Sequence, residues 1–204
     1  MIDKINDKSG TLIQGHIKIF DPETHKIFVN KRNAIHYENM SIALAQSLSN
    51  SGTGFIYSMG FGNGGTSVDP TGIITYLSPN NTGINASLYN QTFEKIVDDR
   101  NVNNVDPFRN KTEVRHVSGT NYTDILVTCL LDYGEPAGQD AFDTALSTED
   151  LYVFDELGLK SYDTNQETML LTHVLFHPVQ KSLNRLIQID YTVRIQSLSG
   201  VLGE

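Results

Sequence analysis

The segment that most constrains the fold is "RLIQIDYTVRIQSL" near the C-terminus, where apolar and polar residues alternate from Ile187 to Gln196. A period of two is typical of a β-strand that buries one face and leaves the other polar. One face carries Ile187, Ile189, Tyr191, Val193 and Ile195, and the other carries Gln188, Asp190, Thr192, Arg194 and Gln196. The pattern therefore predicts a long, half-buried strand.

Short strand candidates run through most of the remaining sequence. Apolar and polar residues alternate over 13–19, the Pro-containing segment "DPETH" follows, and a second apolar run begins at Lys26. Together these predict a β-hairpin. Further candidates are "FIYSMGF", "IITYL", "TFEKIVD", "TEVRHVS", "YTDILVTCLLDY" and "LTHVLFH".

One segment changes period. In "NAIHYENMSIALAQSLSNSGTG", Tyr37, Met40, Leu44 and Leu48 are spaced by three, four and four residues, and good helix formers lie between them. This predicts one main helix over about 36–49, ended by the Asn and Gly residues that follow. Many short strands and one helix indicate a mainly β fold: an antiparallel β-sandwich or barrel-like domain with long polar loops.

The length of 204 residues suits a single domain, 1–204. Residues 1–10 carry no core signal and are expected to be extended. The turn-rich segments 98–110 and 132–149 are expected to be surface excursions, and loops of this length often carry contacts. The candidate interface residues in these loops are Asp98, Arg100, Phe108, Arg109, Tyr133, Glu135 and Pro136.

Composition excludes several classes of function. The formal net charge is −9, with a pI of about 5.0, so a nucleic-acid partner is not expected. No run approaches the roughly 20 apolar residues of a membrane span. The N-terminus lacks the apolar region of a signal peptide, which predicts synthesis in the cytoplasm. The single cysteine, Cys129, lies in a continuous apolar run and is expected to be a small buried hydrophobic residue.

The stretch "FIYSMGFGNGGTSVDPTG" contains G-x-G-x-x-G at Gly60, Gly62 and Gly65. A dinucleotide-binding turn needs a helix that opens at its last glycine, because the helix N-terminus binds the pyrophosphate. Here "TSVDPTGIITYL" follows, and its proline and β-branched residues do not fit a helix. We therefore expect Gly60, Gly62, Asn63, Gly64 and Gly65 to form a structural turn, through positive φ angles or close backbone approach.

Other candidate chemistry is weak. His173 and His177 would share one strand face, which leaves a metal site open, but no zinc-hydrolase motif accompanies them. Glu94 and the acids at 98–99 have no evident catalytic partner and are expected to be solvated charges. We therefore assign no catalytic, cofactor-binding or metal-binding residue and expect a protein that is not an enzyme and needs no cofactor.

Two blocks carry a resemblance to a known class of protein. The first is "VNKRNAIHYENMSIALAQSLSNSGTGFIYSMGFGNGGT", a helix followed by an apolar strand and a glycine turn. The second is "YVFDELGLKSYDTNQETMLLTHVLFHPVQKSLNRLIQIDYTVRIQS". The matching positions of the second block are Glu156, Gly158, Leu159, Pro178, Lys181 and the strand 187–195. Together the blocks resemble tail-collar fibre N-terminal domains and related baseplate or neck proteins of tailed bacteriophages.

This resemblance implies a non-enzymatic structural component of the virion, in the tail, neck, collar or baseplate, of the fibre-attachment type. Its expected partners are copies of itself, in a ring or trimer, and other phage structural proteins. No repetitive shaft follows the final strand, so a complete long fibre is not expected. The alternative is a capsid decoration or a glycan- or receptor-binding module on the virion surface.

Overall fold

The computed structural model describes residues 10–137, 151–162 and 168–198. Its elements, in chain order, are β1 (Gly10–Phe20), β2 (Ile27–Ile35), α1 (Tyr37–Leu48), β3 (Ile56–Gly62), β4 (Thr66–Val68), β5 (Ile74–Tyr76), β6 (Gln91–Ile96), β7 (Lys111–His116), β8 (Tyr122–Leu131), β9 (Leu151–Ser161), β10 (Met169–Leu170), β11 (Thr172–Ser182) and β12 (Ile187–Leu198).

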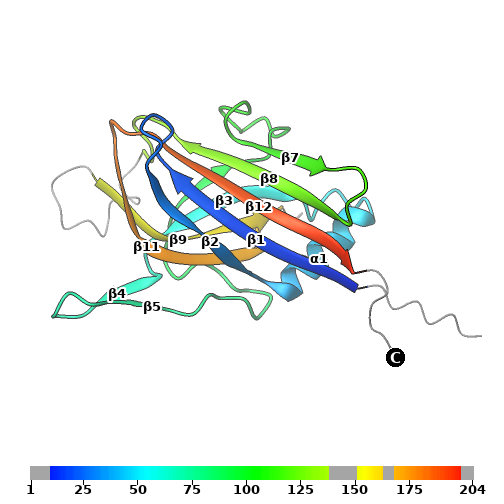
Figure 1. Ribbon diagram of the computed structural model, residues 1–204, viewed down its shortest axis with the longest axis horizontal. Helices are drawn as coiled ribbons and strands as arrows, with labels where there is room; N and C mark the ends of the chain where they lie inside the picture. The colour runs from blue at the N-terminus through cyan, green and yellow to red at the C-terminus, as the bar shows by residue number, and fades with distance from the viewer. Residues whose placement is uncertain (1–9, 138–150, 163–167, 199–204) are drawn as a thin grey trace, which may run out of the picture.

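The main sheet has ten strands, and every pairing in it is antiparallel. Its order is β6-β3-β9-β11-β2-β1-β12-β8-β7, with β10 added to β9. The sheet curls into a half-barrel, with α1 near one end and the separate β4–β5 ribbon projecting from the body (Figure 1). The mainly β, barrel-like fold with one helix is therefore confirmed.

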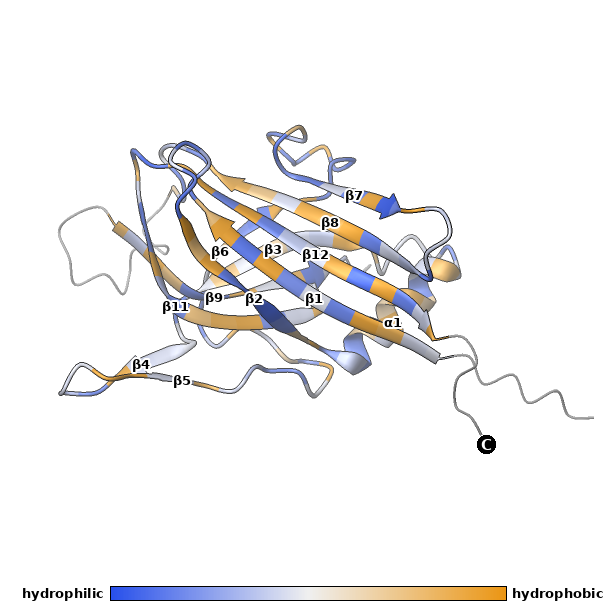
Figure 2. Ribbon diagram, in the orientation of Figure 1, coloured by the Kyte–Doolittle hydropathy of each residue, from blue (hydrophilic) through white to orange (hydrophobic). Residues whose placement is uncertain are grey.

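The core lies inside the curl. Strand β12 is central to it, and its side chains alternate between buried and partly exposed from Ile187 to Arg194. The alternation of apolar and polar residues along β1 and β12 is visible in Figure 2. Five aromatic rings pack in succession across the neighbouring strands β6, β3, β9 and β11: Phe93, Phe61, Tyr152, Phe154 and Phe176. The strand predicted from 187–196 is confirmed, because its apolar face forms one wall of this core.

Helix α1 is shorter by one residue at each end than the predicted helix. The His36 ring caps it, because Nδ1 accepts the backbone N–H of Asn39 at 3.2 Å. The buried face consists of Asn39, Met40 and Ala43. The prediction placed Tyr37 and Leu48 on the apolar face, but they are 72% and 88% exposed, because the helix covers the open end of the curled sheet only along its middle turns.

The predicted hairpin at the start of the chain is present as β1 and β2. Its turn is held by Asp21, whose Oδ1 accepts the backbone N–H groups of Glu23 and Thr24 at 2.9 and 3.0 Å. These bonds and others to the same carboxylate lower the pKa of Asp21, with burial acting in the opposite direction. The sequence patterns named no strand at Leu151–Ser161, although β9 is central to the sheet.

Candidate functional site

The glycine stretch crosses the end of β3 and leads directly into β4. Gly60 and Gly62 lie within β3, and Gly64 and Gly65 follow it. Gly60 is paired with Gly158 of β9 on one side and with Glu94 of β6 on the other. The stretch therefore lies against β9, next to two consecutive buried acids, Asp155 and Glu156.

Glu156 is fully buried, and both of its carboxylate oxygens are occupied. Oε1 accepts the backbone N–H groups of Gly64 at 3.1 Å and Asn90 at 2.8 Å. Oε2 accepts the backbone N–H of Tyr89 at 2.9 Å and lies 2.9 Å from Nε2 of His173. The carboxylate thus joins the glycine turn, the segment before β6 and strand β11.

The His173 ring is held in one tautomer by its neighbours. Its Nδ1 accepts the backbone N–H of Asn80 at 2.8 Å, so the ring proton lies on Nε2 and is donated to Glu156. Burial raises the pKa of Glu156, but the bonds from His173 and from the N–H groups of Asn90 and Tyr89 outweigh it and hold the pKa below its ordinary value.

Asp155 binds the next two residues of the turn. Oδ1 accepts the backbone N–H of Gly65 at 2.9 Å, and Oδ2 accepts both the backbone N–H of Thr66, at 2.9 Å, and its hydroxyl. Burial raises the pKa of Asp155, and the neighbouring Glu156 adds to the rise, while the bonds from Thr66 and Gly65 oppose it. Hereafter Asp155, Glu156, His173 and the backbone of 64–66 are called the carboxylate clasp.

The glycines are required by close approach and not by backbone angle. A side chain on Gly62 would overlap the Glu156 carboxylate and the Asn90 carbonyl, and a Cβ on Gly64 would lie 2.8 Å from the Asn90 nitrogen. On Gly65 it would lie 2.7 Å from a methyl carbon of Leu175. None of Gly60, Gly62, Asn63, Gly64 and Gly65 has a positive φ, so that part of the expectation is wrong. The expected close backbone approach is observed.

The β4–β5 ribbon, hereafter the arm, begins at the clasp. Its strands pair from Thr66 with Tyr76 to Val68 with Ile74. At the tip, Asp69 Oδ1 accepts the backbone N–H groups of Thr71 at 2.8 Å and Ile73 at 3.0 Å. Three apolar side chains of the arm are exposed to solvent, Val68 at 63%, Ile73 at 62% and Tyr76 at 48%, and Ile74 is half-buried.

The predicted loop 98–110 joins β6 to β7 and is ordered by its own side chains. Asn104 Nδ2 donates to the carbonyls of Asp98 at 3.1 Å and Asn110 at 2.8 Å. Asn110 Oδ1 accepts the backbone N–H of Leu130 in β8 at 2.8 Å. Phe108 is 88% exposed. Asp98 is half-buried and Arg100 is exposed.

The two predicted interface loops meet each other. Arg109 forms ion pairs with Asp106 of its own loop and with Asp132 at the start of the second loop. Glu135 pairs with the buried Lys95 of β6. These contacts lie within one chain, so the charged groups of Arg109 and Glu135 already have partners.

The other residues predicted in the second loop are placed differently. Pro136 is buried, and it follows a cis peptide bond from Glu135. Tyr133 is 51% exposed, and its hydroxyl donates to Glu23 at 2.7 Å. Of the predicted excursion 132–149, residues 138–149 lie outside the described part of the chain, as do residues 1–9 of the predicted N-terminal segment.

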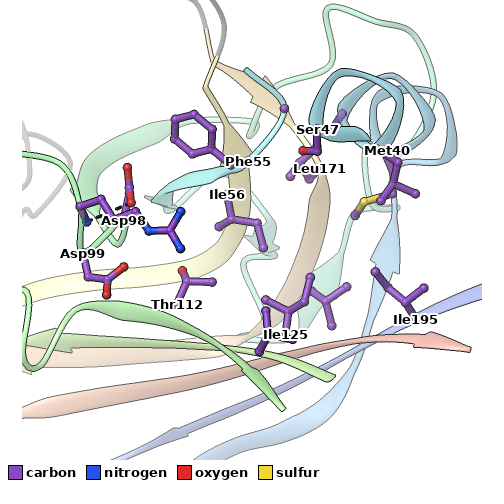
Figure 3. A pocket seen from close by; sticks show the side chains of 16 residues that line it. Met40, Ser47, Phe55, Ile56, Asp98, Asp99, Thr112, Ile125, Leu171 and Ile195 are labelled. Atoms are coloured by element: carbon purple, nitrogen blue, oxygen red, sulfur yellow. Dashed lines mark hydrogen bonds between the residues drawn. The ribbon is translucent and has the colours of Figure 1, made fainter. Parts of the chain in front are cut away.

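An apolar cavity of about 480 Å³ opens at the end of the half-barrel next to α1 (Figure 3). Its walls come from α1, from the start of β3 and from the inner faces of β7, β8 and β12. Asp98, Asp99 and Arg100 lie at its polar side. The volume falls within the range typical of small-ligand pockets. No motif in the sequence indicated this cavity, because its lining comes from five separate elements.

The interpretation of two histidines on one strand face is wrong. His173 is fully buried, whereas His177 is exposed, because a register shift in β11 between Leu175 and Val179 turns the strand between them. Within 10–137, 151–162 and 168–198, no group of three or more His, Cys, Asp and Glu side chains is placed to hold a metal ion. Cys129 is buried as expected, and burial raises the pKa of its thiol to about 12.

No helix in the described part of the chain has the length and apolar character needed to cross a membrane. Comparison with known proteins finds no matching family model, no matching curated protein and no matching solved structure.

Proposed function

We propose that this chain is a non-enzymatic structural component of a tailed-phage particle, in the tail, neck, collar or baseplate. In this role it assembles with copies of itself and with other proteins of the particle. The proposal starts from the resemblance of residues 29–66 and 152–197 to fibre-attachment and baseplate proteins.

The arm is the structural observation that supports assembly with other subunits, which is the part of the proposal that the fold bears on. A two-stranded ribbon is marginally stable by itself in water. Here its base is fixed by the clasp through Gly65 and Thr66, while Val68 and Ile73 point into solvent. A rigid base with an exposed apolar end is suited to contact with another subunit, because burial of these side chains stabilises both partners.

The buried polar groups support the same role. Asp155, Glu156 and His173 are arranged like components of a catalytic site, but their hydrogen-bonding positions are taken by backbone N–H groups and by each other. Groups used in this way hold a turn in place. This use fits a structural protein better than an enzyme.

The test is mass spectrometry of purified virions together with deletion of the gene. We expect the protein in purified particles at a copy number that matches a ring or trimer, and we expect deletion to give incomplete particles. Intact, infectious particles that lack the protein would contradict the proposal. Antibody labelling in electron microscopy locates the protein, and labelling spread over the capsid surface would favour the decoration role instead.

A further inference from the structure

We propose that copies of this chain associate head to tail, with the arm of one copy pairing along the free edge of β7 in the next and covering the cavity beside it. The inference rests on the proposed function in one respect, since both require the chain to assemble with itself. It adds which two surfaces meet, the arm and the β7 edge, and that the contact is head to tail.

The first surface is the edge of the main sheet. Strand β7 pairs with β8 on one side over all six of its residues. Within the described residues, no backbone N–H or carbonyl on its other side has a hydrogen-bond partner. Val114, in the middle of this strand, is 72% exposed. An antiparallel edge of this kind is a template for a strand from another chain.

The cavity lies where an added strand would place its side chains. Thr112 and Val114 project from the same face of β7 and line the cavity, and Ile125 of β8 continues that wall. Phe55 and Ile56 lie on the opposite side, as Figure 3 shows. The free edges of the sheet are therefore β6 and β7, and the cavity opens beside the β7 edge. Alternate side chains of a strand paired with β7 would enter the cavity.

The arm supplies a strand for this edge. It is an extended ribbon whose apolar side chains, Val68 and Ile73, are each more than 60% exposed. Pairing of an arm strand with β7 would extend the ladder from β8 through β7 into the ribbon. A third strand is what a two-stranded ribbon needs for stability.

The arm of one copy is far from the β7 edge of the same copy. Figure 1 shows the arm and β7 on opposite sides of the molecule, with the body of the half-barrel between them. The contact must therefore join two copies through different surfaces. A contact of this type builds a closed ring or an open filament, depending on the rotation between neighbours.

The charges at the two surfaces are compatible. The polar face of β7 carries Lys111, Glu113 and Arg115, two bases and one acid. The arm, residues 66–76, carries a single charged residue, Asp69. The β7 face has a net charge of +1, and Asp98, Asp99 and Arg100 at the polar side of the cavity add −1, so the surface as a whole is close to neutral and suits a ribbon with a single charge.

The experiment compares three variants by sedimentation velocity over a concentration series. The arm variant carries Val68→Asp with Ile73→Asp, and the edge variant carries Val114→Asp. All three side chains are exposed, so folding should be retained, and circular dichroism checks this. The control is Tyr37→Asp, at a side chain that is 72% exposed on the first turn of α1 and lines neither surface.

We expect the wild type and the control to self-associate, and we expect each interface variant to raise the apparent Kd by about a hundredfold. An equimolar mixture of the two interface variants should form a heterodimer and stop there, because the intact arm of one meets the intact edge of the other. A wild type that stays monomeric, interface variants that assemble normally, or a mixture that does not associate would overturn the inference.

The outcome is separate from that for the proposed function. A protein found in virions whose assembly ignores both interface variants would contradict the head-to-tail contact alone. A protein that associates through these surfaces and is absent from virions would contradict the proposed function alone.

Discussion

Replacing Glu156 by glutamine retains the shape of the side chain and turns one acceptor oxygen into a donor group. In the wild type, each carboxylate oxygen accepts two hydrogen bonds, from Gly64 and Asn90 on Oε1 and from Tyr89 and His173 on Oε2. Whichever way the amide is turned, its NH₂ group faces two donors. The His173 ring is fixed as a donor on Nε2, because Nδ1 accepts the N–H of Asn80.

The expected cost follows from these contacts. A buried donor left without a partner costs about 1–3 kcal/mol, and bonds to a charged acceptor contribute more than bonds to a neutral one. With two donors stranded at a fully buried site, we expect Glu156→Gln to lower the free energy of unfolding by about 3–5 kcal/mol. This is a large part of the roughly 5–15 kcal/mol that stabilises a typical domain.

Urea denaturation followed by circular dichroism measures the change at pH 7. The control is Glu113→Gln, which removes a partly exposed carboxylate paired with Lys111 and Arg115 and should change the free energy of unfolding far less than Glu156→Gln does. Hydrogen exchange should show faster exchange of the backbone amides of Gly64 and Asn90 in Glu156→Gln. If Glu156→Gln were as stable as the control variant, the clasp would not hold the turn, and the argument would fail.

Three further predictions concern Asp155, Gly64 and Cys129. The pKa of Asp155 is raised in the folded state, so its contribution to stability is full below the unfolded pKa of about 3.9 and falls as the pH rises through the folded pKa. In urea titrations, the stability advantage of the wild type over Asp155→Asn should therefore be larger at pH 4 than at pH 7. A larger advantage at pH 7 would refute the argument. Gly64→Val should lower the melting temperature strongly and Gly10→Ala hardly at all, because an added Cβ meets a backbone nitrogen at 2.8 Å in the first case and only ordinary contacts in the second. Calorimetry measures both melting temperatures. Neither the wild type nor a folded variant should bind NAD or ATP in titrations. Cys129 should resist thiol reagents at pH 8 in the native protein and react after denaturation, because the buried thiol has a pKa of about 12; rapid native labelling would contradict its burial.

The general fold was predictable because its strongest signals are local. The period of two in 187–196 and the helical spacing at 37–48 both indicate which face of the element is buried. This face is determined by the spacing of apolar residues along the element itself, which the sequence shows directly. The sequence pattern did not predict strand β9, because the acids at 155 and 156 interrupt its apolar run. The backbone N–H groups that bind these two carboxylates lie about 65 to 90 residues away along the chain, and no local pattern contains them.

The candidate sites were predictable only in part, for the same reason. The residues after Gly65 do not fit a helix, and this argued against a dinucleotide-binding turn. They did not indicate what the glycines contact. Composition predicted loops at 98–110 and 132–149, and the structure describes the first of them and residues 132–137 of the second. Their mutual ion pair, from Arg109 to Asp132, and the burial of Pro136 depend on how β6, β7 and β8 are brought together in the sheet.

The glycine turn retains one feature of an anion-binding loop. In such loops, converging backbone N–H groups bind a phosphate. Here the N–H groups of 64–66 converge on carboxylates from β9, so the anion belongs to the same chain. A bound phosphate can leave, whereas a carboxylate in the central sheet is permanent. The same geometry therefore fixes the base of the arm. The buried hydrogen bonds at the base attach the arm to the body, so its exposed tip can project without contributing to that attachment.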